Sequence, residues 1–163
     1  MNVLIVHAHP EPQSFNTALR DHSVRILNEL GHAVRVSDLY AMGFAPVSGP
    51  DDFTDRADPD YLTYALEQRQ GWENKTLAPD ILAEVEKLLW CDLLILHFPL
   101  YWFSVPAILK GWIERIYAYG FAYGVGEHSD SHWGDRFGEG SMAGRRAMVV
   151  TTTGGWASHY APR

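Results

Sequence analysis

Residues 92–106 read DLLILHFPLYWFSVP, an apolar run that leads into an aromatic cluster bounded by prolines. Residues 93–96 are apolar at every position, which is typical of a strand that helices cover on both faces of a parallel sheet. Ser104 followed by Pro106 predicts the start of a helix. The aromatic residues 101–103 therefore lie at the carboxyl end of a strand, where open α/β sheets bind planar ligands.

The elements predicted around this stretch alternate between strand and helix. Apolar runs predict strands at about 3–7, 33–39, 93–96 and 145–152. Amphipathic patterns predict helices from about Phe15 to a stop at Gly31, from 80 to 90 and from 106 to 119, and a short helix over 59–69 that Asp58 caps. The alternation predicts the α/β class, with a doubly wound parallel sheet and helices on both faces.

Two expectations concern burial. In the first helix, an apolar face is expected to pack on the sheet, and it consists of Phe15, Leu19, Ile26 and Leu30. Residues 120–144 contain seven glycines among scattered polar residues, so we expect no buried element there.

The composition predicts a single domain over residues 1–163 and excludes several kinds of partner. Thirteen Lys and Arg against twenty Asp and Glu give a formal charge of −7, so binding to nucleic acid or anionic lipid is not expected. Cys91 is the only cysteine, which excludes an internal disulfide and suits a reducing cytoplasm. The first six residues read as a strand rather than a signal peptide, and prolines interrupt the longest apolar stretch, so neither export nor a membrane span is expected.

Residues 9–16, HPEPQSFN, connect the first strand to the first helix. The N–H groups and the dipole at a helix N-terminus can hold a phosphate or pyrophosphate, and Ser14 and Asn16 could add hydrogen bonds from their side chains. The alternative is that Ser14 only caps the helix while the prolines shape a turn. This loop alone does not decide between the two interpretations.

Two further loops leave the same edge of the predicted sheet. The aromatic residues 101–103 could form a flat wall for a flavin ring, because they lie between prolines where the chain should reach the surface. The alternative for them is ordinary packing in the core. Thr152, Thr153, Gly154 and Gly155 offer hydroxyls and closely approachable backbone amides that suit the polar edge of a flavin, or they form a plain turn.

The histidines do not predict a metal site. His7 and His9 would point to the same side of an ideal strand, but no third ligand lies at an obvious spacing. The stretch 128–132, HSDSH, matches no familiar zinc or calcium loop. No G-x-G-x-x-G fingerprint joins a strand to a helix, which disfavours a Rossmann NAD site. The P-loop and G-x-S-x-G motifs are likewise missing.

Four segments together resemble the NAD(P)H:quinone oxidoreductase family of flavodoxin-like flavoproteins, which includes DT-diaphorase and the ancillary oxidoreductases of bacterial potassium-efflux systems. They are His9 with Ser14–Asn16, the run FPLYWFSVPAILKGW at 98–112, Phe121–Tyr123, and Thr152–Gly155. The second segment is the longest and most specific, and the match extends over nearly the whole chain. The resemblance implies a flavodoxin-like fold and a homodimer with active sites at the interface.

The resemblance also implies which residues hold the flavin. The phosphate end would contact His9, Ser14, Phe15 and Asn16, and the ring would contact Pro99, Leu100, Tyr101, Trp102, Phe103, Thr152, Thr153, Gly154 and Gly155. In this family, NADH or NADPH passes a hydride to the flavin, leaves, and is replaced in the same pocket by a quinone that takes two electrons together. Tyr160 matches a flavin-contacting tyrosine that stabilises negative charge on the reduced ring, and Tyr123 matches an aromatic residue that borders the substrate pocket.

Two features depart from the family pattern. The family carries a histidine a few residues beyond the position of Tyr160, then a further strand and helix, whereas this chain ends at Arg163. We therefore expect the C-terminal strand of the fold to be missing, the strand at 145–152 to be an exposed edge, and half of the charge-stabilising pair to be absent. Val125 stands where some members have a second tyrosine of the substrate pocket.

The leading interpretation is a cytoplasmic enzyme, an NAD(P)H dehydrogenase that reduces quinones or other planar acceptors. One alternative is a flavin-binding regulatory subunit that makes peripheral contact with a membrane transporter, since residues 120–144 resemble the potassium-efflux subgroup. Another is an azo- or nitro-reductase with the same hydride chemistry. Glu11, beside the proposed phosphate site, would repel the phosphate of FMN more than a pyrophosphate, which favours FAD over FMN. No residue pattern separates NADH from NADPH.

Overall fold

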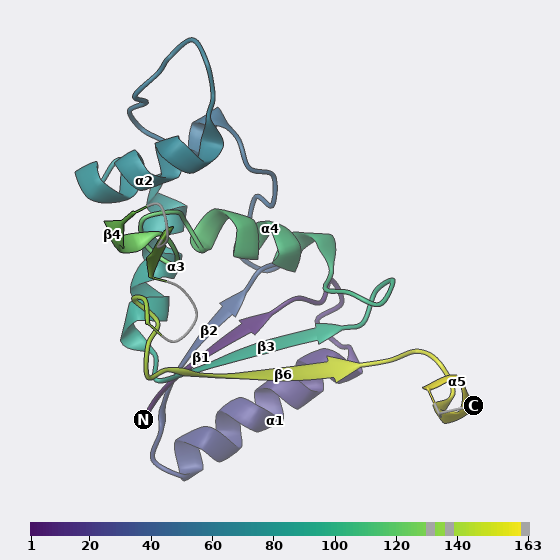
Figure 1. The fold of residues 1–163 in the computed structure, drawn as a ribbon. Coiled ribbons are helices and arrows are strands. Elements are labelled where there is room, and N and C mark those ends of the chain that lie inside the picture. The colour runs from purple at the N-terminus through teal and green to yellow at the C-terminus, as the bar shows by residue number, and fades with distance from the viewer. Residues whose placement is uncertain (130–132, 136–138, 161–163) are drawn as a thin grey trace.

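A parallel sheet of four strands organises the molecule (Figure 1). The computed structural model describes residues 1–129, 133–135 and 139–160. The strand order is β2-β1-β3-β6, so the four carboxyl ends meet along one edge. The bounds are Asn2–His7 for β1, Ala33–Asp38 for β2, Leu93–Pro99 for β3 and Arg146–Thr152 for β6. The four predicted strands are confirmed, although β3 continues beyond its apolar run.

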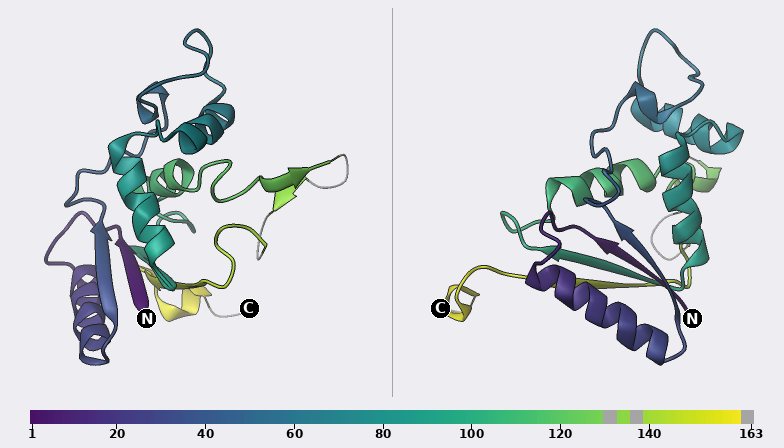
Figure 2. Two further views of the ribbon diagram at one scale, coloured as in Figure 1. Left: turned by 90° about the vertical axis from the view of Figure 1, so that its left-hand side faces the viewer. Right: turned by 180° about the vertical axis from the view of Figure 1, so that it is seen from behind.

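Helices cover both faces of the sheet, as the doubly wound fold requires (Figure 1, Figure 2). One face is covered by α1 (Phe15–Glu29), and the other by α3 (Pro79–Trp90) and α4 (Ala107–Ile116). Each of these helices lies within a connection between parallel strands, which is the usual crossover in such sheets. The predicted α/β architecture is therefore confirmed.

The larger hydrophobic core lies between the sheet and the helices α3 and α4. The apolar stripe predicted for α4 is confirmed, because Leu109, Trp112 and Ile116 are fully buried. Each such side chain contributes roughly 1.5–3 kcal/mol to stability by leaving water. The helix ends at Ile116 rather than at the predicted Tyr119, because the chain turns there and inserts Phe121 into the same core.

The face predicted for α1 is wrong at both of its ends. The side chains of Phe15 and Leu30 are 70% and 66% exposed, whereas Val24 and Leu27 pack on the sheet. At the first turn, α1 presents the polar residue Thr17 to the sheet. An apolar pattern cannot reveal this contact, because the residues that face the sheet near its carboxyl edge are polar.

The short helix lies further along the chain than predicted. It is α2, which spans Tyr64–Asn74 instead of 59–69. Asp58 does not cap it, because the Asp58 carboxylate accepts the N–H groups of Asp60 and Tyr61. These hydrogen bonds close a local turn, a common role for aspartate, and delay the start of the helix.

Small elements complete the fold. They are the single-turn 3-10 helix η1 (Pro50–Asp52), the antiparallel pair β4 (Val125–His128) and β5 (Trp133–Asp135), and α5 (Ala157–Tyr160). The expectation that 120–144 holds no buried element is wrong at Phe121, which is buried and packs against the ring of Trp72.

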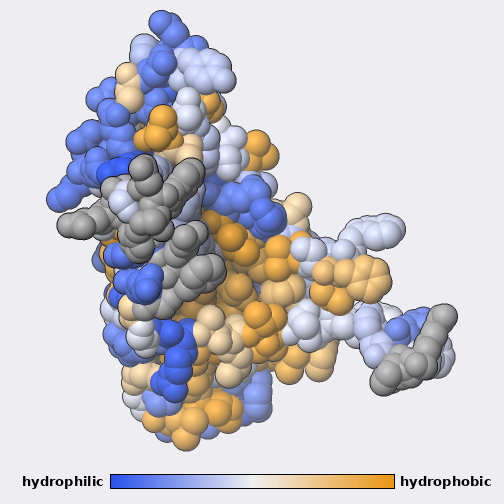
Figure 3. Space-filling view, viewed as in Figure 1, coloured by the Kyte–Doolittle hydropathy of each residue, from blue (hydrophilic) through white to orange (hydrophobic). Residues whose placement is uncertain are grey.

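The strand β6 lies at the edge of the sheet, as expected for residues 145–152. Its side chains Met148 and Val149 are exposed. Figure 3 shows apolar residues gathered on the face of the molecule that β6 crosses in the same view of Figure 1. Within the residues that the structure describes, no helix is both long and apolar enough to cross a membrane.

Candidate functional site

Hydrogen bonds join the three loops predicted to form the site. The N–H of Leu100 donates to the carbonyl of Thr152 at an N···O distance of 2.8 Å, which ties the loop after β3 to the end of β6. The side-chain amide of Asn16 donates to the Thr152 hydroxyl at 2.9 Å, which ties the first turn of α1 to the same residue. Thr152 is therefore the point where the ends of all three loops meet.

Ser14 caps α1, as the plainer interpretation of the first loop predicts. Its Oγ accepts the N–H of Thr17 at 3.1 Å. The N–H groups of Phe15 and Asn16 belong to the same first turn, whose N–H groups have no acceptor within the helix. An anion at this N-terminus would meet such groups and the positive end of the helix dipole, so the cap is compatible with phosphate binding.

Side chains within the first loop fix its shape. Nδ1 of His9 accepts the N–H of Glu11 at 3.0 Å, and the Glu11 carboxylate accepts the N–H of Gln13 at 2.8 Å. Nδ1 of His9 also lies 3.2 Å from the carbonyl of Glu11, so the loop engages this nitrogen. The other nitrogen of the half-buried ring, Nε2, is the one that His9 can offer to a ligand.

Trp102 and Phe103 form a two-residue turn and stand in solvent. The N–H of Tyr101 donates to the carbonyl of Ser104 at 3.0 Å, and the reverse hydrogen bond measures 2.9 Å. Both turn residues are left-handed, with φ of 49° and 59°, a conformation that hairpin turns usually assign to Asn and Gly. Their side chains are 96% and 84% exposed, which excludes the core-packing alternative for both.

The left-handed turn is strained, and it exposes two aromatic side chains to solvent. Each bulky residue in this region costs about 1–2 kcal/mol relative to ordinary backbone conformations. Two strained and exposed aromatic side chains point to a surface for stacking a planar ligand. Pro99 is the last residue of β3 and is buried, so it supports the loop from within the sheet.

Gly155 allows Tyr160 to lie close to the loop after β6. A methyl group on Gly155 would lie 2.9 Å from a ring carbon of Tyr160 and 3.0 Å from its hydroxyl, whereas one on Gly154 would meet nothing within 4 Å. The ring of Tyr160, on α5, therefore packs against the turn after β6 and stays half-exposed. Thr153, in the same loop, is exposed.

Tyr123 lies apart from these loops within one chain. It follows α4, whose first residue adjoins the loop after β3 and whose ten residues carry the chain roughly 15 Å away (Figure 1). Its ring lies 5.2 Å from that of Tyr119, and partial burial, followed by Tyr119, raises the pKa of the Tyr123 phenol. The structure thus brings the other predicted site residues to the carboxyl edge of the sheet and leaves Tyr123 elsewhere.

A buried histidine pair lies beneath the site, and sequence reasoning missed it. His7 ends β1 and His97 lies opposite it on β3, with their Nδ1 atoms 2.9 Å apart. Burial, followed by the charge of Arg20, lowers the pKa of both rings, to about 4 for His7. Spacing in the sequence pairs His7 with His9 instead, but β1 ends before His9, which lies in the loop. The sequence did contain a signal for the pair. In each strand, a histidine occupies the next alternate position after apolar residues that face the same side of the sheet, so both histidines should face that side as well.

The described residues contain no group of three or more His, Cys, Asp or Glu that could hold a metal ion. The stretch at 128–132 lies partly outside the described residues.

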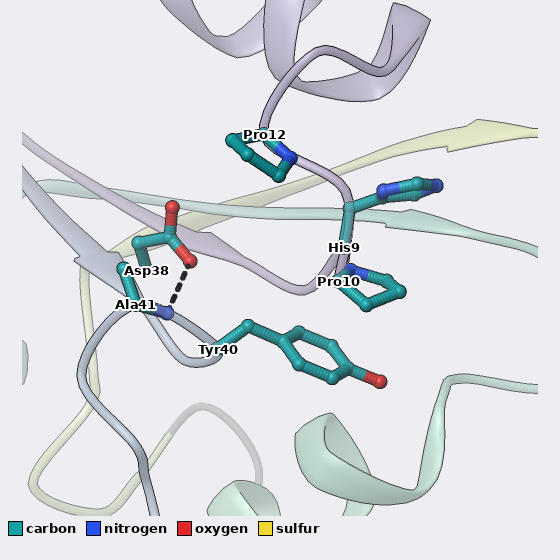
Figure 4. Close-up of a pocket in the computed structure, with 6 residues that line it drawn as sticks. All are labelled: His9, Pro10, Pro12, Asp38, Tyr40 and Ala41. Atoms are coloured by element: carbon teal, nitrogen blue, oxygen red, sulfur yellow. Dashed lines mark hydrogen bonds between the residues drawn. The ribbon is translucent and has the colours of Figure 1, made fainter.

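A pocket of about 310 Å³ lies beside the first loop, at the carboxyl ends of β1 and β2 (Figure 4). Its lining residues are His9, Pro10, Pro12, Asp38, Tyr40 and Ala41. The Asp38 carboxylate accepts the N–H of Ala41 at 3.1 Å and pairs with Arg20 at 2.5 Å. Because this lining includes a carboxylate and neither Lys nor Arg, it favours a phosphate less than the N-terminus of α1 does.

Comparisons with known proteins agree with this geometry. A family model described as a flavodoxin-like fold matches residues 1–163. The crystal structure of a protein from Klebsiella pneumoniae assigned as a quinone reductase superposes with a TM-score of 0.94 at 54% identity, covering 100% of this chain and 63% of that one.

Two curated relatives match over almost the same range. The ribosyldihydronicotinamide dehydrogenase-like protein traD of Penicillium crustosum is 49% identical over 163 residues, which are 100% of this chain and 61% of the relative. The ribosyldihydronicotinamide dehydrogenase (quinone) of Homo sapiens is 43% identical over 159 residues, which are 97% of this chain and 65% of the relative. The chain thus spans less than two thirds of the length of these relatives.

Proposed function

The chain belongs to the family with the flavodoxin-like fold, and from this we propose that it is a flavin-dependent NAD(P)H:quinone oxidoreductase. It would reduce quinones or similar planar acceptors by two electrons. The observation that carries the proposal is the turn at Trp102 and Phe103, which exposes two strained aromatic rings at the carboxyl edge of the sheet. The human relative, named as a quinone dehydrogenase, and the Klebsiella protein, assigned as a quinone reductase, support it.

The residues at this edge fit a flavin. The phosphate end would meet the first-turn N–H groups of α1, with His9, Ser14 and Asn16 as side-chain partners. The ring would stack on the exposed aromatic turn, and its polar edge would face the loop at 152–155. A bound flavin would supply a carrier that accepts hydride from the reduced nicotinamide and delivers it to the acceptor.

The side chains around the ring would decide the order of events. Trp102 and Phe103 would cover one face of the flavin, which leaves the opposite face for the reductant and then for the quinone. The two substrates would take turns in one pocket, so we expect ping-pong kinetics. Tyr160, held against the turn at Gly155, would donate its hydroxyl proton in a hydrogen bond to the edge where negative charge develops.

FAD is the flavin we propose, with FMN as the second choice. Glu11 places a carboxylate in the phosphate loop, where it accepts the N–H of Gln13. This charge would repel the doubly charged phosphate of FMN more than the pyrophosphate bridge of FAD. The reductants to compare are NADH, NADPH and dihydronicotinamide riboside, the last because of the names of the two curated relatives.

A homodimer would complete the substrate pocket. Tyr123 follows the C-terminal end of α4, whereas the aromatic turn of its own chain precedes the N-terminal end of that helix. A second copy could bring its own Tyr123 to that turn and cover part of the exposed aromatic surface. The single, buried and reduced Cys91 suits the cytoplasm, which we propose as the compartment.

Acceptor kinetics test the proposed activity. We expect NAD(P)H oxidation that depends on added quinone, with parallel double-reciprocal plots and a kcat/KM for quinones above those for azo and nitro compounds. Rates that prefer an azo or nitro acceptor would favour the corresponding reductase, and stoichiometric capture of a membrane transporter would favour the regulatory subunit.

A matched pair of variants tests the aromatic turn. Trp102→Ala should weaken flavin binding about tenfold, because an aromatic stacking contact is lost. Tyr61→Ala removes another exposed aromatic ring, which lies in the loop before α2 and outside the proposed site. This variant should leave the affinity for flavin unchanged. Equal affinities for the two variants would contradict the stacking role of Trp102.

A further inference from the structure

The sheet face that packs against α1 becomes polar in its last row. On β1, the buried residues Val3 and Ile5 are followed at the next alternate position by His7, and on β3 the same alternation ends at His97. The two imidazoles are 0% and 2% exposed, and their rings are stacked with centroids 5.1 Å apart. Polar rings buried in this way require hydrogen-bond partners to offset the loss of water.

The geometry of the pair determines where its protons lie. The Nδ1 atoms are 2.9 Å apart, so one must donate and the other accept. Nε2 of His7 lies 3.4 Å from Oγ1 of Thr17, whereas Nε2 of His97 is buried without a partner among the described residues. A buried N–H without an acceptor is the rarer arrangement in proteins, so the proton of His97 lies on Nδ1 and donates to His7. His7 then carries its proton on Nε2.

The hydrogen bonds continue from this pair into the first loop. Nε2 of His7 donates towards Oγ1 of Thr17, and the Thr17 hydroxyl donates to the carbonyl of Glu11 at 3.1 Å. Oγ1 of Thr17 also lies 3.0 Å from Oγ of Ser14, the cap of α1. A directed chain of hydrogen bonds thus runs from β3 through β1 to the loop, and the Ser14 hydroxyl joins it as a second donor to Oγ1 of Thr17, whose own proton is used on Glu11.

Burial keeps the pair neutral, and the charged groups around it alter this only slightly. Burial and Arg20 on α1 lower the pKa of both rings, His9 lowers that of His7 further, and Asp38 on β2 raises it. Arg20 and Asp38 are paired with each other at 2.5 Å, so their opposite charges largely cancel and burial dominates. A proton added to the pair would set two N–H groups against each other between the Nδ1 atoms.

We propose that His7 and His97 are positioning residues for the flavin phosphate, because they orient Thr17 and thereby hold the Glu11 carbonyl and the Ser14 cap in the shape that the N-terminus of α1 presents to an anion. The inference rests on the proposed function, since it assumes a phosphate-bearing flavin at this site. Neither histidine touches the ligand; both act through Thr17.

Binding of riboflavin, FMN and FAD tests the proposal, because riboflavin lacks the phosphate. Fluorescence titration gives the dissociation constant of each flavin for the protein and its variants. His97→Leu and Thr17→Val should each lower the preference for FMN and FAD over riboflavin by about tenfold and leave the affinity for riboflavin unchanged. Thr17→Val keeps both imidazoles in place, so it remains informative if His97→Leu does not fold.

Two controls separate positioning from general packing. His97→Asn offers a side-chain N–H close to the position of Nδ1 and should retain the preference of the wild type. Ile95→Val, two residues earlier on the same buried face, removes only a methylene and should also retain it. In nitrogen-15 NMR spectra, His97 should be protonated on Nδ1 and His7 on Nε2.

Each other outcome has a defined meaning. A parallel loss of affinity for riboflavin and FMN, an unchanged preference in His97→Leu and Thr17→Val, or the reversed protonation of the two rings would overturn the positioning role alone. So would a wild type that binds all three flavins equally. A wild type that binds none of them would overturn the proposed function and the inference with it.

Discussion

Gly154 and Gly155 are neighbours in the loop after β6, but their surroundings differ. A Cβ at Gly155 would collide with the ring of Tyr160, whereas a Cβ at Gly154 would stand in open space. Gly155→Ala should therefore displace Tyr160 and lower kcat for quinone reduction roughly tenfold, because a hydrogen-bond donor near developing charge is moved. Gly49→Ala, which lies outside the proposed site and whose added methyl group would meet nothing within 4 Å, is the matched control and should retain the rate. Steady-state kinetics of both variants check this, and equal rates would contradict the placement of Tyr160.

His7 gives the stability of the protein a defined pH dependence. Its pKa falls from 6.5 to about 4 on folding, mainly through burial. The unfolded chain therefore binds a proton in this range that the folded chain does not, and the pKa of His97 is lowered in the same direction. The free energy of unfolding should keep its full value above the pKa that His7 has in the unfolded chain, 6.5. It should fall as the pH drops towards 4, and the contribution lost from His7 is roughly 3 kcal/mol.

Urea unfolding at about pH 7 and about pH 4.5 measures this loss. His7→Leu should show a smaller loss between the two pH values, whatever its stability at neutral pH. His22→Leu, a change of an exposed histidine on α1, should show the wild-type loss. If His7→Leu and the wild type lose the same free energy, His7 is not the group that titrates.

Among the structural elements, the turn after β3 has two residues in the unfavourable left-handed conformation, and we propose that the same two residues stack on the flavin. Replacing its two residues by Trp102→Asn and Phe103→Gly would supply the residues that the left-handed turn prefers. The double variant should gain about 1–2 kcal/mol in free energy of unfolding and lose at least tenfold in flavin affinity. Chemical unfolding and flavin titration measure the two effects.

The C-terminus of α2 offers the matched control for this turn. Lys75 is also left-handed there, with φ of 60°, but it lies away from the proposed site. Lys75→Gly should raise the free energy of unfolding by up to about 1 kcal/mol and leave flavin affinity unchanged. A double turn variant that gains stability and still binds flavin tightly would show that the aromatic rings are not the stacking surface.

The helices and strands could be predicted from the sequence where the spacing of apolar residues determines which side chains are buried, as in α4. They could not be predicted where polar side chains are buried. The helix α2 buries Glu67, whose carboxylate accepts the N–H groups of Ala57 and Asp58, and no hydrophobic pattern reveals such a contact. The loops of the site could be located because apolar runs in the sequence mark where the strands end. The left-handed turn and the histidine pair could not be predicted, because they depend on three-dimensional contacts that the apolar pattern does not reveal.

At the scale of the whole molecule, Arg115 links parts of the fold that are distant in sequence. This residue of α4 is 4% exposed and pairs with Asp52 in η1 and Asp80 in α3, at 2.7 Å each. Arg115→Met should lower the free energy of unfolding by about 3–5 kcal/mol, because it leaves the buried charge of Asp52 uncompensated. Lys110→Met, on the exposed side of the same helix, should change it by less than about 0.5 kcal/mol. Equal effects in urea unfolding would contradict the linking role.

The parallel sheet with helices on both faces followed from the alternation of strands and helices, whereas right-handed crossovers narrowed its strand order to a few topologies without fixing it. The family resemblance added the expectation that β6 is an exposed edge, and the position of β6 confirms it. What the sequence could not supply was the separation of Tyr123 from the aromatic turn, because it depends on how α4, which lies between them in the chain, packs on the sheet.

We propose above all that the carboxyl edge of this sheet binds a flavin on its exposed aromatic turn. Titration of the purified protein with FAD, followed by absorbance and flavin fluorescence, tests it most directly. We expect saturable binding, flavin absorption bands that stay with the protein on gel filtration, and fluorescence quenched by stacking on Trp102. A folded protein that remains colourless and leaves the fluorescence of added FAD and FMN unchanged would contradict it.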